Sequence, residues 1–321
     1  MPYVLSTFND QLHMNANFLS LPAILFYFLT WVLIIRCVHA SIKNPALKKK
    51  FSKLHTLTWL LALISHIAGL HYPLFIGEPL TLNFILLGSY VTWFLSLILF
   101  ITTLNRKIES LAIPILPLTM LSIFFAMTLG ADTQSTINMK SGLGIHILSS
   151  LLAYSTLMLA SFQALLLAMQ NNHLHARKNS NFIRSLPSLE NMEHLLFRFI
   201  KIGVILLTIG LLTGFYFLDN LFGSSIAHKT ILSIIAWVVF SVLLFGRWKY
   251  GWRGKTAIRW TLGGFIVLML AFFGTKFVQE FVLDTPTNMT KHTPTLLHDS
   301  SLGFLTTARI YTELHDVDKQ T

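Results

Sequence analysis

Thirty-six consecutive residues, 141–176, contain no Asp, Glu, Lys or Arg and read SGLGIHILSSLLAYSTLMLASFQALLLAMQNNHLHA. A helix needs about 20 mainly apolar residues to cross the ~30 Å hydrocarbon core of a bilayer. This segment is therefore long enough to span a membrane as a single helix. It lacks the alternation with period two that the strands of a membrane barrel require.

Further apolar runs lie on both sides of this segment. The last three are shorter, but flanking Lys and Arg side chains can extend along a helix end to the interface. We predict an all-α fold, a polytopic transmembrane helical bundle with eight spans. Their approximate bounds are 18–38, 56–74, 82–103, 109–129, 143–170, 199–217, 229–246 and 258–281.

The composition excludes several classes of protein. Hydrophobic residues make up 54% of the 321 residues and charged residues 12%, against roughly 25% charged in soluble domains. The single cysteine, Cys37, excludes an internal disulfide, a thiolate zinc site and covalent haem attachment through Cys-x-x-Cys-His. The net charge of +11 falls in the gaps between apolar runs, so we expect no nucleic acid as a partner and the lipid bilayer as the surroundings.

The distribution of positive charge predicts the orientation. Of the 24 Lys and Arg residues, 18 fall in the alternate connections 36–55, 104–108, 171–201 and 247–259. Cytoplasmic connections carry an excess of Lys and Arg. We therefore predict that these connections face the cytoplasm and that both termini lie outside.

Two segments fall outside the predicted spans. The connection 171–201 is polar and basic, contains Pro187 and regains helical spacing of apolar residues near its end, so it is interpreted as an interfacial connector. The tail 282–321 is rich in Thr and Pro with mixed charge, and is predicted to be a weakly ordered extracytoplasmic segment beyond a transmembrane domain of residues 1–281.

Histidine is the residue type in the spans that is best suited to chemistry. No span carries Asp, Glu, Lys or Arg deep in its core, which weakens an ion-coupled transport function. At 1.5 Å per residue, His66 lies ~15 Å into its span, near the midplane, whereas His146 and His228 begin their spans at the outer side. A buried neutral imidazole needs a partner for its ring N–H, and binding a metal or haem is one use for it. The alternatives are a core histidine for His66 and hydrated helix-end residues for the other two.

Glycines form a face of small residues on the span 199–217. Gly203, Gly210 and Gly214 follow one another at intervals of seven and four residues. This spacing places them on one side of the helix, where a second helix can approach closely. The pattern predicts close helix packing at this face.

Several motifs also occur in a recognisable order. They are the run from Gly144 through His146 to Ala153-Tyr154, the run from Ile202 to Gly214 followed by His228 to Trp237, and the short motifs Gly251-Trp-Arg-Gly254 and Ala271-Phe-Phe-Gly274. Over residues 56–281, their order and spacing resemble the cytochrome c assembly superfamily of CcsA-, CcmC- and HemX-like membrane proteins. Within that superfamily they are most similar to the YpjD branch of Gram-negative inner-membrane proteins.

The resemblance implies a multi-pass protein of the bacterial inner (cytoplasmic) membrane that binds haem as its cofactor at outer-facing histidines. His146 occupies the position of the family's first outer histidine, and His66 resembles a histidine of an early span. The family's haem synthetases carry a tryptophan-rich ligation loop before the seventh span. Residues 215–229 contain no Trp, and Lys229 alone matches that loop, which closes where His228 stands.

The candidate cofactor-binding residues are therefore His146, His228, His66 and Lys229. Of these, His146 and His228 are the candidate metal ligands, and Lys229 is a cation for a haem propionate. The resemblance predicts a haem-binding protein of cytochrome c assembly type, with haem and membrane proteins of cytochrome biogenesis as partners. We expect no catalytic residues and no enzymatic activity. The alternatives are a permease-like subunit of a transport system and a regulatory membrane protein that binds no cofactor.

Overall fold

The computed structural model describes residues 20–38, 45–75, 84–105, 108–129, 141–175, 186–217 and 227–274. Every regular element in these ranges is helical, and eight of the helices are long and apolar enough to cross a membrane. The predicted fold class and the predicted number of spans are confirmed. The first 19 residues and the tail 282–321 lie outside the described ranges, so the orientation of the termini and the domain boundary stay predictions.

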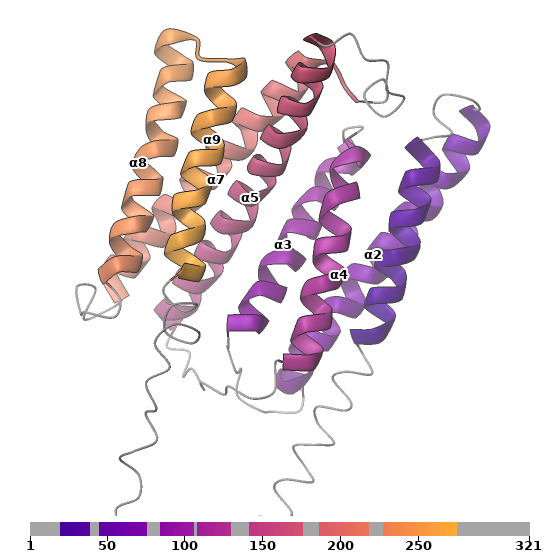
Figure 1. Cartoon of the computed structure of the whole chain (residues 1–321). Coiled ribbons are helices and arrows are strands. Elements are labelled where there is room, and N and C mark those ends of the chain that lie inside the picture. Colours follow the sequence, from indigo (N-terminus) through magenta and orange to yellow (C-terminus); the bar gives the residue numbers. More distant parts are fainter. Residues whose placement is uncertain are drawn as a thin grey trace, which may run out of the picture. The chain divides into compact units, whose positions relative to one another are not determined.

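The helices follow one another along the chain with short connections (Figure 1). They are Ser20–Val38, α2 (Pro45–Phe75), α3 (Phe84–Asn105), the 3-10 turn η1 (Glu109–Leu111), α4 (Ala112–Leu129), α5 (Ser141–His175), α7 (Leu189–Phe217), α8 (Ala227–Tyr250), α9 (Gly254–Met269) and the π-helical turn η2 (Leu270–Gly274).

Most helix starts lie within a few residues of the predicted ones, but α2 and α7 begin well before them. α2 starts at Pro45 and not near residue 56, and proline suits the first helical turn because its missing N–H is not needed there. α7 starts at Leu189 and not near residue 199, because nothing breaks the helix after Pro187. The part of the predicted connector that follows Pro187 is therefore the first three turns of α7. Its face buries Met192, Leu195 and Phe199.

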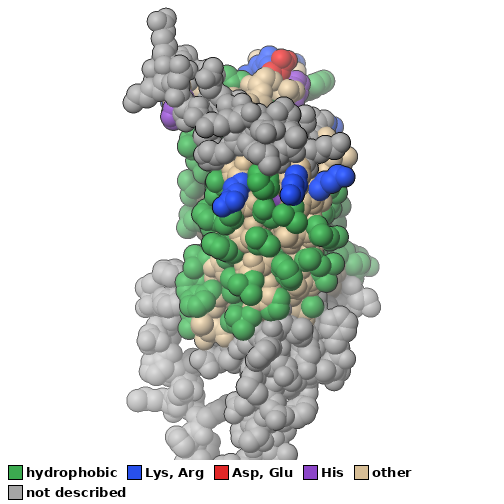
Figure 2. Space-filling model, turned by 90° about the vertical axis from the view of Figure 1, so that its right-hand side faces the viewer, with side chains coloured by type: hydrophobic (Ala, Val, Ile, Leu, Met, Phe, Trp, Pro, Cys, Tyr) green, Lys and Arg blue, Asp and Glu red, His purple; other side chains and the backbone are tan. Residues whose placement is uncertain are grey.

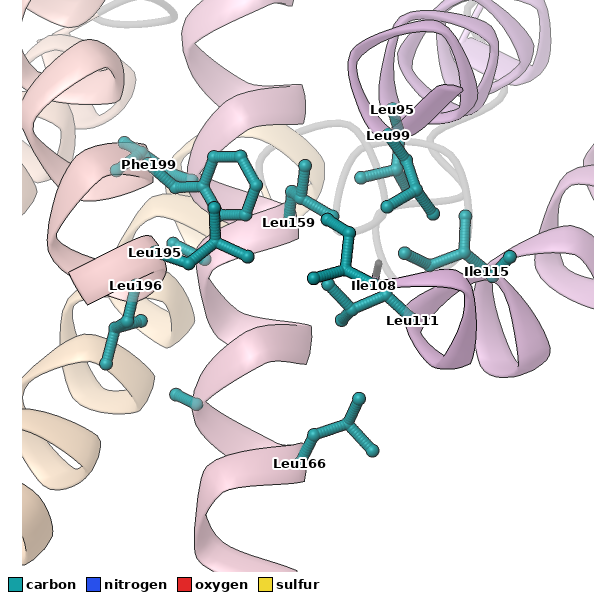
Figure 3. Close-up of a cluster of buried hydrophobic side chains, with 14 of the residues drawn as sticks. Leu95, Leu99, Ile108, Leu111, Ile115, Leu159, Leu166, Leu195, Leu196 and Phe199 are labelled. Atoms are coloured by element: carbon teal, nitrogen blue, oxygen red, sulfur yellow. The ribbon is translucent and has the colours of Figure 1, made fainter. Parts of the chain in front are cut away.

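α5 is the central helix. Of its most apolar stretch 72% is buried, the highest share among the eight spans, and it packs against α3, α7 and α9. Figure 3 shows Leu159 of α5 pointing toward Ile108 and Leu111, with Leu195 and Phe199 of α7 on its other side. The charge-free segment 141–175 thus forms the most buried of the described spans, and its exposed apolar residues lie on the side that no helix covers.

Hydrogen bonds between helices supplement this packing. Trp59 Nε1 donates to Ser96 Oγ at 2.9 Å, and Ser155 Oγ donates to the Val91 carbonyl at 2.9 Å. Trp237 Nε1 donates to Thr208 Oγ1 at 2.8 Å. Such bonds matter in a bilayer, where lipid tails are as apolar as leucine and the hydrophobic effect does not bring helices together.

The positive side chains of the described helices gather at one end of the bundle. Figure 2 shows a row of Lys and Arg side chains close to one end of a surface that is otherwise largely hydrophobic. Among the Lys and Arg residues whose side chains the structure describes, only Lys229 lies at the opposite helix ends. The others are Arg36, Lys50, Lys53, Arg198, Lys201, Arg247, Lys249, Arg253, Lys255 and Arg259. This end corresponds to the predicted cytoplasmic side.

Candidate functional site

The candidate site lies where α5 and α7 approach each other closely. A Cβ atom added to Gly203 would lie 2.6 Å from Leu157 Cγ, and one added to Gly210 would lie 3.1 Å from Ser150 Oγ. A Cβ atom added to Gly214 would lie 2.8 Å from Cε1 of His146. The predicted small-residue face therefore receives α5 along its length, and at its outer end it receives the imidazole ring of His146.

His146 is held in one orientation by a hydrogen bond to α7. Its Nδ1 lies 2.9 Å from the carbonyl oxygen of Gly210. A carbonyl oxygen can only accept, so Nδ1 carries the proton, and in the neutral ring Nε2 then has a free lone pair. In the parts of the chain that the structure describes, no hydrogen bond is made to this Nε2. The half-buried ring thus presents one unprotonated nitrogen.

A cation lies near this ring, and an aromatic side chain lies beside that cation. The Nζ atom of Lys229, in the first turn of α8, lies 5.2 Å from the centre of the Phe272 ring, and its charge is near enough to interact electrostatically with His146. Phe272 belongs to the π-helical turn η2 and packs on Tyr154 of α5, with 4.9 Å between ring centres. The fold therefore brings His146 and Lys229, 83 positions apart in the sequence, to one end of the bundle.

The second predicted iron ligand, His228, lies in the first turn of α8, directly before Lys229. Its backbone therefore starts at the same end of the bundle as the first turn of α5. Its side chain lies outside the described residues.

His66 lies in a different part of the bundle. It is 1% exposed, and both ring nitrogens face hydroxyl groups, Nδ1 at 3.4 Å from the Tyr27 hydroxyl oxygen and Nε2 at 3.0 Å from Ser89 Oγ. The Tyr27 ring also meets the imidazole edge-on, with 5.8 Å between ring centres. His66 is therefore packed among the helix Ser20–Val38, α2 and α3, and is not brought together with His146.

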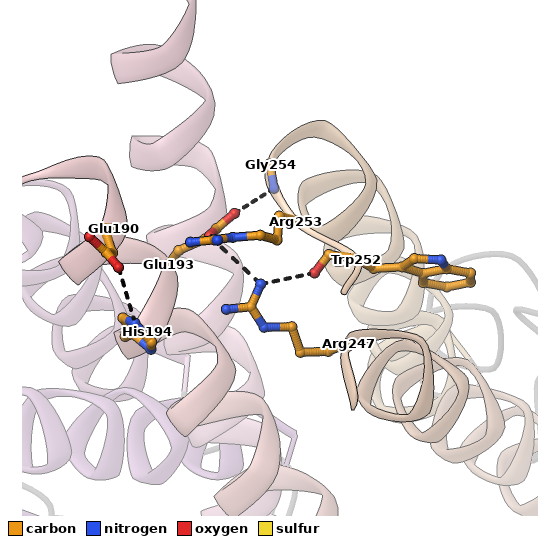
Figure 4. A network of polar contacts seen from close by, with 7 residues as sticks. All are labelled: Glu190, Glu193, His194, Arg247, Trp252, Arg253 and Gly254. Carbon is orange, nitrogen blue, oxygen red and sulfur yellow. Dashed lines mark hydrogen bonds and ion pairs between the residues drawn. The ribbon is translucent and has the colours of Figure 1, made fainter. Parts of the chain in front are cut away.

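A polar cluster at the other end of α7 was not identified from the sequence. The Glu193 carboxylate accepts hydrogen bonds from Arg253 Nε at 2.9 Å and from the backbone N–H of Gly254. Arg247 Nη1 lies 3.9 Å from the same carboxylate and donates to the Trp252 carbonyl at 3.2 Å (Figure 4). The cluster joins α7 to the turn between α8 and α9. The sequence indicates this cluster only weakly, through the acidic Glu193 next to the apolar Met192 in a predicted helical pattern.

This cluster borders a cavity of about 380 Å³. The lining residues come from α5, α7 and the start of α9; they are Leu167, Asn171, Leu189, Glu190, Glu193, Arg253, Gly254 and Ile258. The carboxylate of Glu193 raises the pKa of the Arg253 guanidinium, so this arginine is charged at every physiological pH.

A model of a known protein family matches most of the chain. The family model described as cytochrome C assembly protein matches residues 54–283. The inner membrane protein YpjD of Escherichia coli K12 is 39% identical over 141 residues, which are 44% of this chain and 53% of that protein. The chain thus spans about half the length of this relative. No solved structure matches the chain.

More distant relatives are named for cytochrome c. The cytochrome c biogenesis protein CcsA of a Prochlorococcus marinus strain is 25% identical over 220 residues, covering 59% of this chain and 70% of that protein. The CcsA protein of Chlamydomonas reinhardtii is 28% identical over 140 residues, covering 42% of this chain and 38% of that protein. With the eight helices and the family match taken together, the protein is a multi-pass protein of the inner membrane, and the chain belongs to the cytochrome c assembly protein family.

Proposed function

We propose that the protein binds haem as a factor of cytochrome c assembly and holds it at the predicted outer ends of α5, α7 and α8. The observation that carries this proposal is the hydrogen bond from Nδ1–H of His146 to the Gly210 carbonyl. Histidines that bind metals almost always donate their other ring N–H to a carbonyl, a carboxylate or water, which fixes the tautomer and the ring orientation. Haem, if bound here, would supply an iron that Nε2 of His146 could ligate.

The neighbours of His146 support this assignment. A haem site needs apolar walls for the ring and a few well-placed polar groups. Phe272 and Tyr154 provide an aromatic wall, and Lys229 provides a cation that can pair with a propionate. Gly214 leaves room for the imidazole because it carries no side chain.

The two other predicted histidines have different places in the proposal. His228 is the candidate second ligand because it lies in the first turn of α8, next to Lys229. His66 belongs to a separate, deeper site if it binds haem, and its Nε2 would have to give up the contact with Ser89. We therefore propose that His146 contributes most to haem binding, with no catalytic step and with membrane proteins of cytochrome biogenesis as partners.

The test is a haem titration of the full chain purified in mild detergent, followed by absorption spectroscopy. His146→Ala should lose most of the bound haem while membrane levels stay unchanged. His173→Ala is a matched control, because His173 lies on the same helix and its Nδ1 bonds only within that helix, to the Met169 carbonyl at 2.9 Å. It should bind haem as the parent does.

Two results would contradict the proposal. Equal haem content in the parent and in His146→Ala would remove His146 from the site. A well-folded parent protein that binds no haem would favour the permease-like subunit or the regulatory protein that binds no cofactor.

A further inference from the structure

We propose that the hairpin between α8 and α9 binds the phosphate headgroup of an anionic phospholipid at the predicted inner surface. Three exposed cations carry this inference, Lys249 in the last turn of α8 and Lys255 and Arg259 in the first turns of α9. Lys255 and Arg259 are four residues apart and therefore lie on one face of α9.

The geometry of the turn keeps these cations close to one another along the chain. Gly251 and Gly254 have φ angles of 67° and 54°, which glycine adopts without the steric cost that a side chain imposes. The backbone N–H of Trp252 donates to the Gly246 carbonyl at 3.2 Å. Only three residues therefore separate the end of α8 from the start of α9.

The acidic side chains beside this hairpin are already engaged. Glu193 binds Arg253 at 2.9 Å, and Glu190 lies 3.9 Å from His194, with which it forms an ion pair when the imidazole is protonated (Figure 4). Across the described helices, no ion pair joins Lys249, Lys255 or Arg259 to a carboxylate. Three positive charges therefore face outward without an internal counter-charge, and they complement an anion supplied by the surroundings.

The aromatic side chains of the hairpin favour lipid as the source of that anion. The side chain of Trp248 is 80% exposed and that of Tyr250 is 67% exposed, and the Phe245 ring lies 6.1 Å from that of Trp248 and 6.3 Å from that of Tyr250. Trp and Tyr concentrate at the headgroup level of a bilayer. Phe245, one turn further into the span, is also half exposed, so an apolar surface continues directly from the cations into the predicted membrane.

The experiment measures lipid binding to the full chain in detergent. Native mass spectrometry counts the lipids retained during titration with phosphatidylglycerol and, in parallel, with neutral phosphatidylcholine. The variant K249Q/K255Q/R259Q should bind phosphatidylglycerol roughly 100-fold more weakly, because each Lys or Arg near an anionic surface contributes about five-fold. Its binding of phosphatidylcholine should not change.

The matched control is R36Q/K50Q/K53Q, which removes the same charge at the same end of the bundle from other helices. It should lower phosphatidylglycerol binding much less than the hairpin variant does, because its three cations lie on two other helices and not at the proposed headgroup site. The charge-preserving variant K249R/K255R should behave as the parent, and K249Q/R259Q, about 25-fold weaker by the same reasoning, replaces the triple variant if that one does not fold.

Three results would overturn the proposal. The first is a parent protein that binds the two lipids equally. The second is an equal loss in the hairpin and control variants, which would indicate an effect of net charge alone. The third is undiminished phosphatidylglycerol binding by the hairpin variants, which would leave an acidic protein surface as the partner of these cations.

Discussion

Replacing Gly214 with Ala should displace the His146 ring while leaving the imidazole group itself intact. The new Cβ atom would lie 2.8 Å from Cε1 and 3.0 Å from Nδ1 of His146. Carbon atoms in contact prefer separations of 3.5–4.0 Å, so the ring has to retreat by roughly 1 Å. The hydrogen bond from Nδ1 to the Gly210 carbonyl, now 2.9 Å long, then reaches a length at which it no longer holds the ring.

This displacement should lower both the free energy of unfolding and the affinity for haem. Overpacking costs about 1–3 kcal/mol and the lost hydrogen bond about 0.5–1.5 kcal/mol, while Ala recovers up to ~1 kcal/mol of helix propensity over Gly. With the full gain in helix propensity, the free energy of unfolding should therefore fall by about 0.5–3.5 kcal/mol. Loss of a group that orients a metal ligand lowers affinity by about 10–100-fold, so haem affinity should fall by that factor.

The assay combines haem titration with thermal unfolding in detergent. Gly263→Ala is the control, because its Cβ atom would meet nothing within 4 Å and the variant should bind haem as the parent does. If Gly214→Ala bound haem with the parent's affinity, the hydrogen bond between His146 and Gly210 would have no part in the site.

Three further predictions concern topology, the tail and the inner cluster. Reporter fusions after Lys140 and after Lys178 should report an external and a cytoplasmic position, and two reports from one side would refute the predicted orientation. Truncation after Phe281 should leave membrane levels nearly unchanged on an immunoblot, whereas a large loss would show that the tail packs on the bundle. Glu193→Gln should lower the free energy of unfolding by about 2 kcal/mol, as expected for buried hydrogen bonds to charged groups. The exposed Glu190→Gln should have almost no effect, and equal stability of these two variants would rule out a stabilising role for the cluster.

The helical spans could be predicted because a bilayer sets both their length and their freedom from charge. The stretch 141–176 satisfies both conditions, and its residues 141–175 form α5. The start of α7 could not be predicted in the same way. Residues 189–198 lie where the predicted connector meets the span, and their helical state depends on burial of Met192, Leu195 and Leu196 by neighbouring helices.

The residues of the candidate site could be predicted from the sequence, but the contacts between them could not. The position of His146 at a helix start was evident from the sequence, and the spacing of Gly210 and Gly214 indicated a close helix contact. That these features meet depends on a pairing between positions 64 residues apart, which no local pattern encodes. Glu193 was missed for the same reason, because its partner Arg253 lies 60 residues further along the chain.

The central claim is that Nε2 of His146 binds the haem iron, and chemical rescue of His146→Gly tests it most directly. The variant leaves a space the size of the lost imidazole beside Gly214. If Nε2 of His146 binds the iron, the variant loses the parent's haem absorption spectrum, and free imidazole restores it in a saturable manner. A His146→Gly protein that keeps the parent spectrum without imidazole would contradict the account, as would one whose spectrum imidazole leaves unchanged.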